Sequence, residues 1–261
     1  MAPHDRRLGR RAGAWAAGAA GAATFAHFLP SVCVLGQWSP VRLRALPGGW
    51  CRWWGPPGSA HVALTFDDGP SPDTTPRTLD LLDDLGMRAT FFVLGSQAEY
   101  HPELVAELRR RGHGVGSHGY RHEHHLLRTP GWIRQDMAAA VAAIEATGER
   151  PRWYRPAYGQ LTARTVLEAR RHDMEVVLWS VWGHEWSETD PEPVMARLSP
   201  GLQPGAIVLL HDNDVSCPPG TAAVTHRSLE LLAGALADRG LQAVDLDTLF
   251  EVAPAAEPVS W

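Results

Sequence analysis

Short apolar runs that alternate with amphipathic stretches constrain the fold of this chain more than any other feature. Between the runs lie segments whose apolar residues recur at helical spacing. Parallel strands need such a crossover between one strand and the next, so the alternation predicts an α/β fold, a distorted barrel of about seven parallel strands. The predicted strands span residues 61–66, 89–94, 115–117, 153–155, 176–181, 207–210 and 243–246.

Three of the intervening helices have clear start or stop signals. The first is predicted to begin with Thr75 as its N-cap and Pro76 at its first helical position, and to end near Gly86. The other two span residues 102–111 and 132–147, and each stops at the glycine that follows it. These helices supply the crossovers that the predicted sheet requires.

The composition divides the chain into three parts. We expect a signal-like or anchor-like segment and linker over residues 1–58, one folded domain over 59–252, and a tail over 253–261. Four arginines between residues 6 and 11 precede a stretch, residues 12–41, that has no Asp, Glu, Lys or Arg. This pattern predicts an exported or membrane-anchored protein whose domain lies outside the cytoplasm. An Ala-rich leader of a cytoplasmic protein is the alternative.

Charge and cysteine content exclude some classes of protein. The formal net charge is -5, and no basic stripe follows the first residues, so a nucleic-acid partner is not expected. Cys33, Cys51 and Cys217 are too few and too scattered for a disulfide framework or a cysteine-based zinc site. A disulfide between Cys51 and Cys217 stays open.

Polar residues with catalytic chemistry occur at the ends of four predicted strands. In a parallel barrel the loops that follow the strands meet at one face, and active sites lie there. The sequence therefore predicts a site at the carboxyl ends of the strands. Its candidates are Asp67 and Asp68 after the first strand, His118 and His122 after the third, Arg155 in the fourth, and His211 and Asp212 after the sixth.

Asp67 and Asp68 are adjacent in the segment T-F-D-D-G-P, residues 65–70. Neighbouring carboxylates repel each other unless a cation or hydrogen bonds separate their tasks, which favours a metal site. Asp-Asp-Gly-Pro is also a common turn sequence. The segment alone leaves both interpretations open.

His118 and His122 are four residues apart, a spacing that lets two imidazoles bind one ion. Two histidines and one carboxylate leave coordination positions free for water and substrate, as in catalytic metal sites. A chance pair is the alternative, because the chain has 13 histidines. Glu123, His124 and His125 are rival ligands.

Arg155 and His211 each end an apolar run. A buried arginine at this point would hold a carboxylate ionised and oriented, whereas an ordinary surface ion pair is the alternative. His211 brings an ionisable imidazole to the same face, and a structural role is its alternative. Neither residue alone predicts a catalytic site, and that interpretation of both depends on the other motifs.

Taken together, these motifs resemble the polysaccharide deacetylase family, which is also called the NodB homology domain or carbohydrate esterase family 4. The resemblance runs over residues 61–249 and rests on four motifs in order: T-F-D-D-G-P, the His118 and His122 pair, R-P-A-Y-G at 155–159, and L-L-H-D at 209–212. It implies a hydrolase that removes N-acetyl or O-acetyl groups from a polysaccharide or oligosaccharide such as chitin oligomers or peptidoglycan. It also implies a monomer with one divalent metal ion, zinc first, with cobalt or nickel as alternatives.

The resemblance further implies roles for individual residues. Asp67 corresponds to the general base, Arg155 to the arginine that orients it, and His211 to the general acid. The implied metal ligands are Asp68, His118 and His122, the backbone N–H of Tyr158 is an oxyanion donor, and Trp186 and Leu209 are walls of the acetyl pocket.

Two departures from the family pattern bear on activity. Gly119 stands where the family has a Ser or Thr that supports the loop between the histidines. The family's D-x-x-D-W segment aligns with residues 182–186, W-G-H-E-W, so that Trp182 and Glu185 replace both aspartates. The first of these aspartates is expected to support the acid histidine, so Glu185 or another group must replace it, or His211 is tuned differently.

Two other functions remain open. Relatives of the family hydrolyse cyclic imides, ureides and other small amides, and a carbohydrate-binding protein with impaired catalysis is the second alternative. The intact acidic, histidine and arginine residues argue against the latter. Five tryptophans are candidates for sugar stacking, although buried tryptophans more often belong to a core: Trp132, Trp153, Trp179, Trp182 and Trp186.

Overall fold

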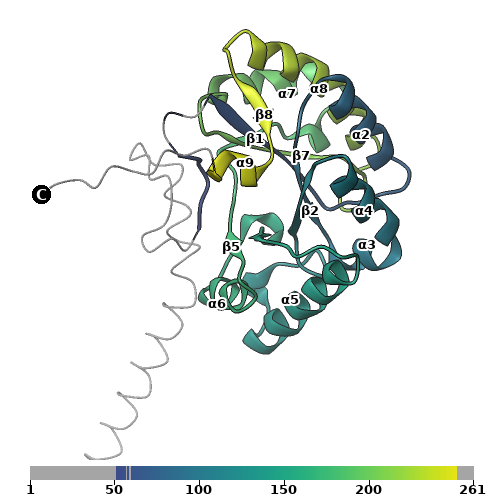
Figure 1. Cartoon of the computed structure of the whole chain (residues 1–261), viewed down its shortest axis with the longest axis vertical. Helices are drawn as coiled ribbons and strands as arrows, with labels where there is room; N and C mark the ends of the chain where they lie inside the picture. Colours follow the sequence, from purple (N-terminus) through teal and green to yellow (C-terminus); the bar gives the residue numbers. More distant parts are fainter. Residues whose placement is uncertain (1–50, 57, 59, 252–261) are drawn as a thin grey trace, which may run out of the picture.

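A computed structural model describes residues 51–56, 58 and 60–251 of the chain (Figure 1). The predicted signal or anchor, most of the linker and the predicted tail therefore lie outside the described residues. No helix in the described part is long and apolar enough to cross a membrane.

The described domain has one sheet of parallel strands, in agreement with the predicted α/β barrel. Its order is β5-β4-β3-β2-β1-β7-β6, and β8 pairs with the first half of β1. The strands are β1 (His61–Asp67), β2 (Thr90–Val93), β3 (Gly114–Ser117), β4 (Trp153–Tyr154), β5 (Glu175–Val176), β6 (Val181–Trp182), β7 (Ile207–His211) and β8 (Gln242–Val244).

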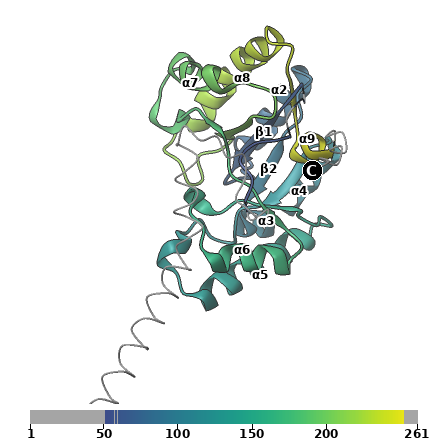
Figure 2. The same ribbon diagram turned by 90° about the vertical axis from the view of Figure 1, so that its left-hand side faces the viewer.

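Helices surround this sheet, with α7 and α8 at one end of the molecule and α5 and α6 at the other (Figures 1 and 2). The three predicted helices are present within two residues of their predicted bounds. The described helices are α2 (Thr75–Asp84), α3 (Gly95–Tyr100), α4 (Pro102–Arg110), α5 (Pro130–Glu145), α6 (Ala163–Arg171), α7 (Pro191–Leu198), α8 (Thr221–Ala237) and α9 (Leu246–Glu251).

Strand β1 lies at the centre of the sheet, and its register with β2 and β7 aligns the ends of the three strands. Val62, Leu64 and Phe66 on one of its faces belong to the main hydrophobic core. At its end Asp67 pairs in register with Phe92 of β2 and with His211 of β7. The register therefore brings the carboxyl end of β1 beside those of two strands that lie far away in the sequence.

The predicted strand 176–181 is divided in the structure into β5 and β6. The reason is a segment that we expected to be linker: Arg52 forms a parallel bridge with Val177 and accepts a hydrogen bond from the amide of Leu178 at 2.7 Å. Cys51 and Trp53 are buried beside it. The packed domain thus begins before the predicted boundary at residue 59.

One smaller prediction was wrong, and one open alternative is settled. Thr74, rather than Thr75, is the N-cap of α2, and the Thr75 hydroxyl instead donates a hydrogen bond to Asp212 Oδ2 at 2.5 Å. Cys51 and Cys217 do not form a disulfide; both are free thiols, the first buried and the second partly exposed.

Candidate active site

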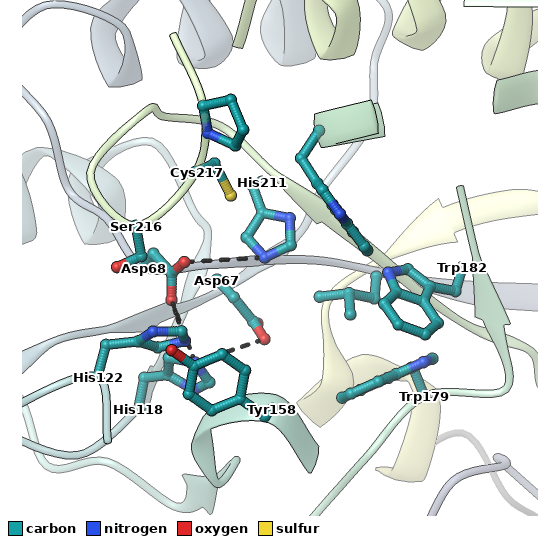
Figure 3. Close-up of a pocket in the computed structure, with 13 residues that line it drawn as sticks. Asp67, Asp68, His118, His122, Tyr158, Trp179, Trp182, His211, Ser216 and Cys217 are labelled. Atoms are coloured by element: carbon teal, nitrogen blue, oxygen red, sulfur yellow. Dashed lines mark ion pairs between the residues drawn. The ribbon is translucent and has the colours of Figure 1, made fainter. Parts of the chain in front are cut away.

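A pocket of about 270 Å³ opens at the carboxyl ends of the strands. Eight of the nine residues with predicted roles line it (Figure 3). The ninth, Arg155, is fully buried and pairs with Asp67 at 2.8 Å. The lining consists of Asp67, Asp68, His118, His122, Tyr158, Trp179, Trp182, Trp186, Leu209, His211, Ser216, Cys217 and Pro218.

Asp67 is held in a fixed orientation by groups on other strands. Nη1 of Arg155 donates to Asp67 Oδ1 at 2.8 Å and to the Thr65 hydroxyl at 2.8 Å, and Nη2 donates to the Leu178 carbonyl at 3.0 Å. Arg155 is fully buried, so this charge-assisted contact is shielded from water. Arg155 is therefore a buried partner of Asp67, and the surface ion pair is excluded.

Asn213 also holds this end of β1, although no sequence motif marked it as a site residue. Its side-chain amide donates to the Asp67 carbonyl at 2.9 Å and to Asp212 Oδ1 at 2.8 Å. Asp212 in turn accepts the Thr75 hydroxyl. The only available signal was its place two residues after His211.

Asp68 turns its carboxylate into the same pocket because its backbone leaves the strand. Successive strand residues normally point to opposite faces, but Asp68 has a φ of 76°, in the left-handed region that Asp tolerates better than most residues. The backbone thereby directs two adjacent carboxylates into one pocket. The segment is therefore a turn that also places both carboxylates where a metal ion could bind.

The carboxylate of Asp68 faces the predicted histidine pair. Its Oδ1 lies 3.2 Å from Nε2 of His118 and 3.4 Å from Nε2 of His122. Burial tends to raise the pKa of Asp68, but the imidazoles of His118, His211 and His122 hold it well below its usual range. Oδ1 is buried and has no hydrogen-bond partner among the described residues. An unpartnered buried carboxylate oxygen fits the role of a metal ligand.

The two imidazoles are prepared for the same ion. Nδ1 of His118 hydrogen-bonds with the Arg155 carbonyl at 2.8 Å, which leaves Nε2 directed at Asp68. Burial lowers the pKa of His122 to about 4, so its ring is neutral near pH 7, the form that ligates metals. The ligand atoms of Asp68, His118 and His122 all lie within 4.8 Å of one another. This donor set fits a divalent cation of the zinc type.

The rival ligands nearby are engaged elsewhere. Glu123 pairs with Arg128 at 2.6 Å. The His124 ring stacks on Tyr158, and Nδ1 of His125 contacts the Thr165 hydroxyl at 3.0 Å. The structure thus separates the predicted pair from its neighbours.

Asp136 on α5 supports the loop that lacks the family hydroxyl. Its two carboxylate oxygens accept the backbone N–H groups of Tyr120 at 3.0 Å and Arg121 at 3.2 Å. Gly119 has a φ of 86°, and a Cβ there would lie 3.0 Å from Asp136 Oδ2. The absence of a side chain at Gly119 therefore leaves room for the Asp136 carboxylate, which supports the loop in place of the Ser or Thr hydroxyl of the family.

Glu185 supports His211 directly. Its Oε1 lies 2.7 Å from Nδ1 of His211 and accepts the His211 backbone N–H at 2.7 Å. Burial tends to lower the pKa of His211, but the hydrogen bond and negative charge of Glu185 raise it to about 9. Of the alternatives that the altered segment left open, the structure therefore shows Glu185 as the partner of His211.

Trp182 instead joins an aromatic wall. Its ring centroid lies 5.4 Å from that of Trp179 and 4.9 Å from that of Trp186, and Trp186 meets His211 edge-on at 5.4 Å. We call Trp179, Trp182 and Trp186 the aromatic side of the pocket, and Asp67, Asp68, His118, His122 and Arg155 the polar side. Of the five candidate tryptophans, Trp153 is buried in the core and Trp132 does not line this pocket.

Tyr158 lies at the mouth of the polar side. Its backbone is left-handed, with a φ of 58°, and its ring centroid lies 4.3 Å from that of His122 and 3.7 Å from that of His124. The side chain is half exposed. The Tyr158 ring thus covers one of the two imidazoles.

A parallel barrel that carries a buried arginine–carboxylate pair beside a carboxylate–histidine group at its strand ends defines a class of protein: a hydrolase with a candidate metal-binding site. The comparisons with known proteins name its family. The sequence model of the family described as polysaccharide deacetylase matches residues 55–177.

Individual relatives agree over most of the domain. The chain is 33% identical over 193 residues to a chitooligosaccharide deacetylase of Bradyrhizobium sp. (strain ANU 289), a match that covers 71% of this chain and 88% of the relative. The crystal structure of the Bc1960 peptidoglycan N-acetylglucosamine deacetylase superposes with a TM-score of 0.72 at 29% identity, over 78% of this chain and 94% of that one. The structure of a family 4 acetyl xylan esterase from Clostridium thermocellum, in complex with a cobalt ion, superposes with a TM-score of 0.66 at 29% identity. The match covers 73% of this chain and 90% of that one.

This chain belongs to the polysaccharide deacetylase family. The family resemblance of its motifs and the parallel barrel are both confirmed.

Proposed function

We propose that this chain hydrolyses the N-acetyl groups of a polysaccharide or oligosaccharide of N-acetylated amino sugars, with one divalent cation held by Asp68, His118 and His122. The observation that carries the proposal is the different environment of two adjacent carboxylates. Asp67 is bonded to buried Arg155, whereas Asp68 faces two imidazoles. Similarity to deacetylases of chitin oligomers and peptidoglycan supports the substrate class.

Asp67 is the proposed general base. A cation at the Asp68 group would polarise the acyl carbonyl and acidify a water molecule, as divalent ions do in hydrolases. Asp67 takes a proton from the attacking water while Arg155 keeps the carboxylate in position. The fixed orientation matters because a base must lie within hydrogen-bond reach of the proton that it accepts.

His211 is the proposed general acid. When the carbon–nitrogen bond of the amide breaks, the departing amine needs a proton, and Nε2 of His211 supplies it. The Glu185 contact at Nδ1 orients the ring, and the pKa of about 9 keeps it protonated at neutral pH. The acid and the base reach the pocket from neighbouring strands, β7 and β1.

The remaining predicted residues surround the acyl group. We propose that the Tyr158 amide donates to the oxyanion that forms during attack, and that Leu209 and Trp186 contact the acetyl methyl. Both side chains line the pocket together with His211. The edge-on contact of Trp186 with His211 supports a position close to the reacting bond.

Zinc is the proposed metal. Imidazole and carboxylate ligands suit zinc, and three protein ligands leave a position for water, as in catalytic zinc sites. Cobalt and nickel accept the same donors, and the cobalt-bound acetyl xylan esterase is a relative with a different ion.

We also propose that the protein acts as a monomer outside the cytoplasm, exported or anchored through its first residues. The support is the arginine cluster at residues 6–11 and the uncharged stretch 12–41 that follows. A fusion of residues 1–58 to a reporter that is active only after export tests the proposal. Activity of the fusion is expected, and its absence together with a soluble cytoplasmic reporter contradicts export.

The experiment that tests the activity is acetate release from a panel of substrates by zinc-loaded protein. Chitin oligomers, peptidoglycan and acetylated xylan represent the glycans, and a cyclic imide represents the alternative reaction. We expect acetate from at least one N-acetylated glycan and no ring opening of the imide. Imide cleavage without acetate release from any glycan would replace this proposal with the small-amide alternative.

A further inference from the structure

A second group of metal-ligating side chains lies on the other side of Asp68. The ligand atoms of Asp68, His211 and Cys217 all lie within 4.8 Å of one another. Asp68 and His211 end β1 and β7, and Cys217 follows on the loop that leads to α8. In Figure 3 the Cys217 thiol and His211 lie on one side of Asp68, and His118 and His122 lie on the opposite side.

The carboxylate of Asp68 offers one oxygen to each group. Its Oδ1 faces His118 and His122 at 3.2 and 3.4 Å, whereas its Oδ2 lies 3.8 Å from Nε2 of His211. A separation of 3.8 Å is too long for a hydrogen bond but leaves room for an ion between oxygen and nitrogen. Carboxylates that bridge two cations about 3.5–4 Å apart are a feature of two-metal hydrolase sites.

His211 is oriented as a metal-bound histidine would be. Its Nδ1 is hydrogen-bonded to Glu185 Oε1 at 2.7 Å, and Glu185 is fully buried. A carboxylate behind one ring nitrogen fixes the other nitrogen as the ligand. Here that other nitrogen is Nε2, which faces Asp68.

The donor types select the kind of cation. Thiolate, imidazole and carboxylate together suit zinc or cobalt, whereas magnesium and calcium prefer oxygen ligands. Cys217 has no disulfide partner among the described residues, and its side chain reaches the pocket. Its thiol is therefore available to a cation that enters from solvent.

We infer that Asp68, His211 and Cys217 form a second, inhibitory site for a divalent cation of the zinc type. Binding releases two protons to solvent, one from the Cys217 thiol and one from Nε2 of His211, and places the cation on that nitrogen. That nitrogen is the one that protonates the departing amine, so a loaded second site stops turnover. The inhibition, though not the binding, rests on the role proposed above for His211.

The second site fills after the first. Both cations share Asp68, so the second ion binds against the positive charge of the first and loses part of the carboxylate's attraction. The first site has two further imidazole ligands of its own. Excess zinc therefore produces inhibition, while one equivalent produces activity.

Cobalt titration of metal-free protein tests the binding. Thiolate-bound cobalt has a near-ultraviolet charge-transfer band that imidazole and carboxylate ligands do not give. We expect no such band with the first equivalent, its appearance with the second, and its loss in Cys217→Ser. A band at the first equivalent would make Cys217 a ligand of the first site, and no band at any stoichiometry would remove it from metal binding; either result overturns the inference.

Zinc inhibition tests the consequence. For each variant the activity at tenfold excess zinc is divided by its activity at one equivalent, so that differences in basal rate cancel. In the wild type and in the control Ser216→Ala we expect excess zinc to reduce activity at least fivefold, a ratio of about 0.2 or less. In Cys217→Ser the ratio should stay near one. Equal inhibition in all three overturns the inference, whereas inactivity at one equivalent would count against the proposed deacetylase function instead.

Discussion

The two sides of the pocket differ in how their residues are held. On the polar side, two functional groups are fixed by hydrogen bonds from a buried neighbour: the Arg155 guanidinium fixes Asp67 and the Arg155 carbonyl fixes His118. On the aromatic side, Trp179, Trp182 and Trp186 contact one another through their rings. The polar side carries most of the family motifs, whereas on the aromatic side Trp182 replaces an aspartate of the family pattern. We propose that the polar side carries the reaction and that the aromatic side affects the acid and the substrate.

The largest expected effect is on the polar side, in Asp67→Asn. The variant loses the base but keeps its hydrogen-bonding shape, so kcat should fall by about 10²–10⁴-fold while zinc stays bound. Acetate release and metal content of the purified variant are the two measurements. The control Asp73→Asn, on the exposed part of the same loop, should behave as the wild type. Full activity in Asp67→Asn would show that the polar side does not determine the reaction as we describe.

Arg155→Met should have the largest effect on stability. It leaves the buried Asp67 carboxylate without its partner, which typically costs about 3–5 kcal/mol. Urea denaturation measures the change in the free energy of unfolding. The control Arg109→Met breaks an ion pair with Glu149 whose arginine is half exposed, and should cost about 0–1 kcal/mol. Equal effects of the two substitutions would mean that burial does not distinguish the Arg155 pair.

Glu185→Gln tests the link between the two sides. A pKa of about 9 keeps His211 protonated below that pH, so both the acid form and the stability from the ion pair are present at neutral pH and are lost as pH rises through about 9. The variant should lower this pKa toward its ordinary value near 6.5. The alkaline loss of kcat should then begin at a lower pH. At a pH above both pKa values, kcat of the variant should be roughly tenfold lower than that of the wild type for each unit by which the pKa of His211 falls.

The control for this profile is Glu188→Gln, on the same loop, because Glu188 pairs with Arg197 and not with His211. Its pH profile should match that of the wild type. If the alkaline loss of kcat is unchanged in Glu185→Gln, Glu185 does not raise the pKa of His211.

Gly119→Ser restores the family residue and should nevertheless destabilise the protein. The new side chain has to adopt a left-handed φ and approach Asp136 Oδ2, which we expect to cost about 1–3 kcal/mol. The melting temperature and the affinity for zinc should both fall. Gly131→Ser is the matched control, because a Cβ there meets no atom within 4 Å. Higher stability in Gly119→Ser would disprove the replacement of the hydroxyl by Asp136.

Trp182→Ala should have the smallest effect on catalysis and act on the aromatic side alone. Loss of one aromatic contact is worth about 0.5–1.5 kcal/mol, so KM should rise roughly two- to tenfold with little change in kcat. Steady-state kinetics on the best glycan of the panel provide the measurement. The matched Trp132→Ala, outside the pocket, should leave KM unchanged, and a larger loss of kcat than of KM in Trp182→Ala would assign Trp182 to the chemistry.

Much of the polar side could be predicted because its residues end apolar runs. A strand end in a parallel sheet points to one face, so Asp67, His118, Arg155 and His211 converge without knowledge of their contacts. The left-handed backbone of Asp68 could not be read from the sequence. Without it, the two adjacent carboxylates would point to opposite faces.

Most supporting contacts could not be predicted, because they join residues that are far apart and carry no motif. Asp136 lies on a helix 16 residues from Tyr120. Glu185, 26 residues from His211, is the exception, because its place in the altered segment made it one of the candidates. Arg52 lies in a segment without strand periodicity, yet it bridges to Val177 and divides a predicted strand. Such contacts depend on how the loops pack over the strand ends, and local patterns do not encode that.

Zinc titration of metal-free wild-type protein, with acetate release from an N-acetylglucosamine oligomer as the readout, tests the central claim most directly. The account predicts no acetate from metal-free protein and a linear rise of activity that reaches its maximum at one equivalent of zinc. Acetate release without metal, or no release after zinc is restored to folded protein, would contradict a deacetylase that depends on the Asp68, His118 and His122 group.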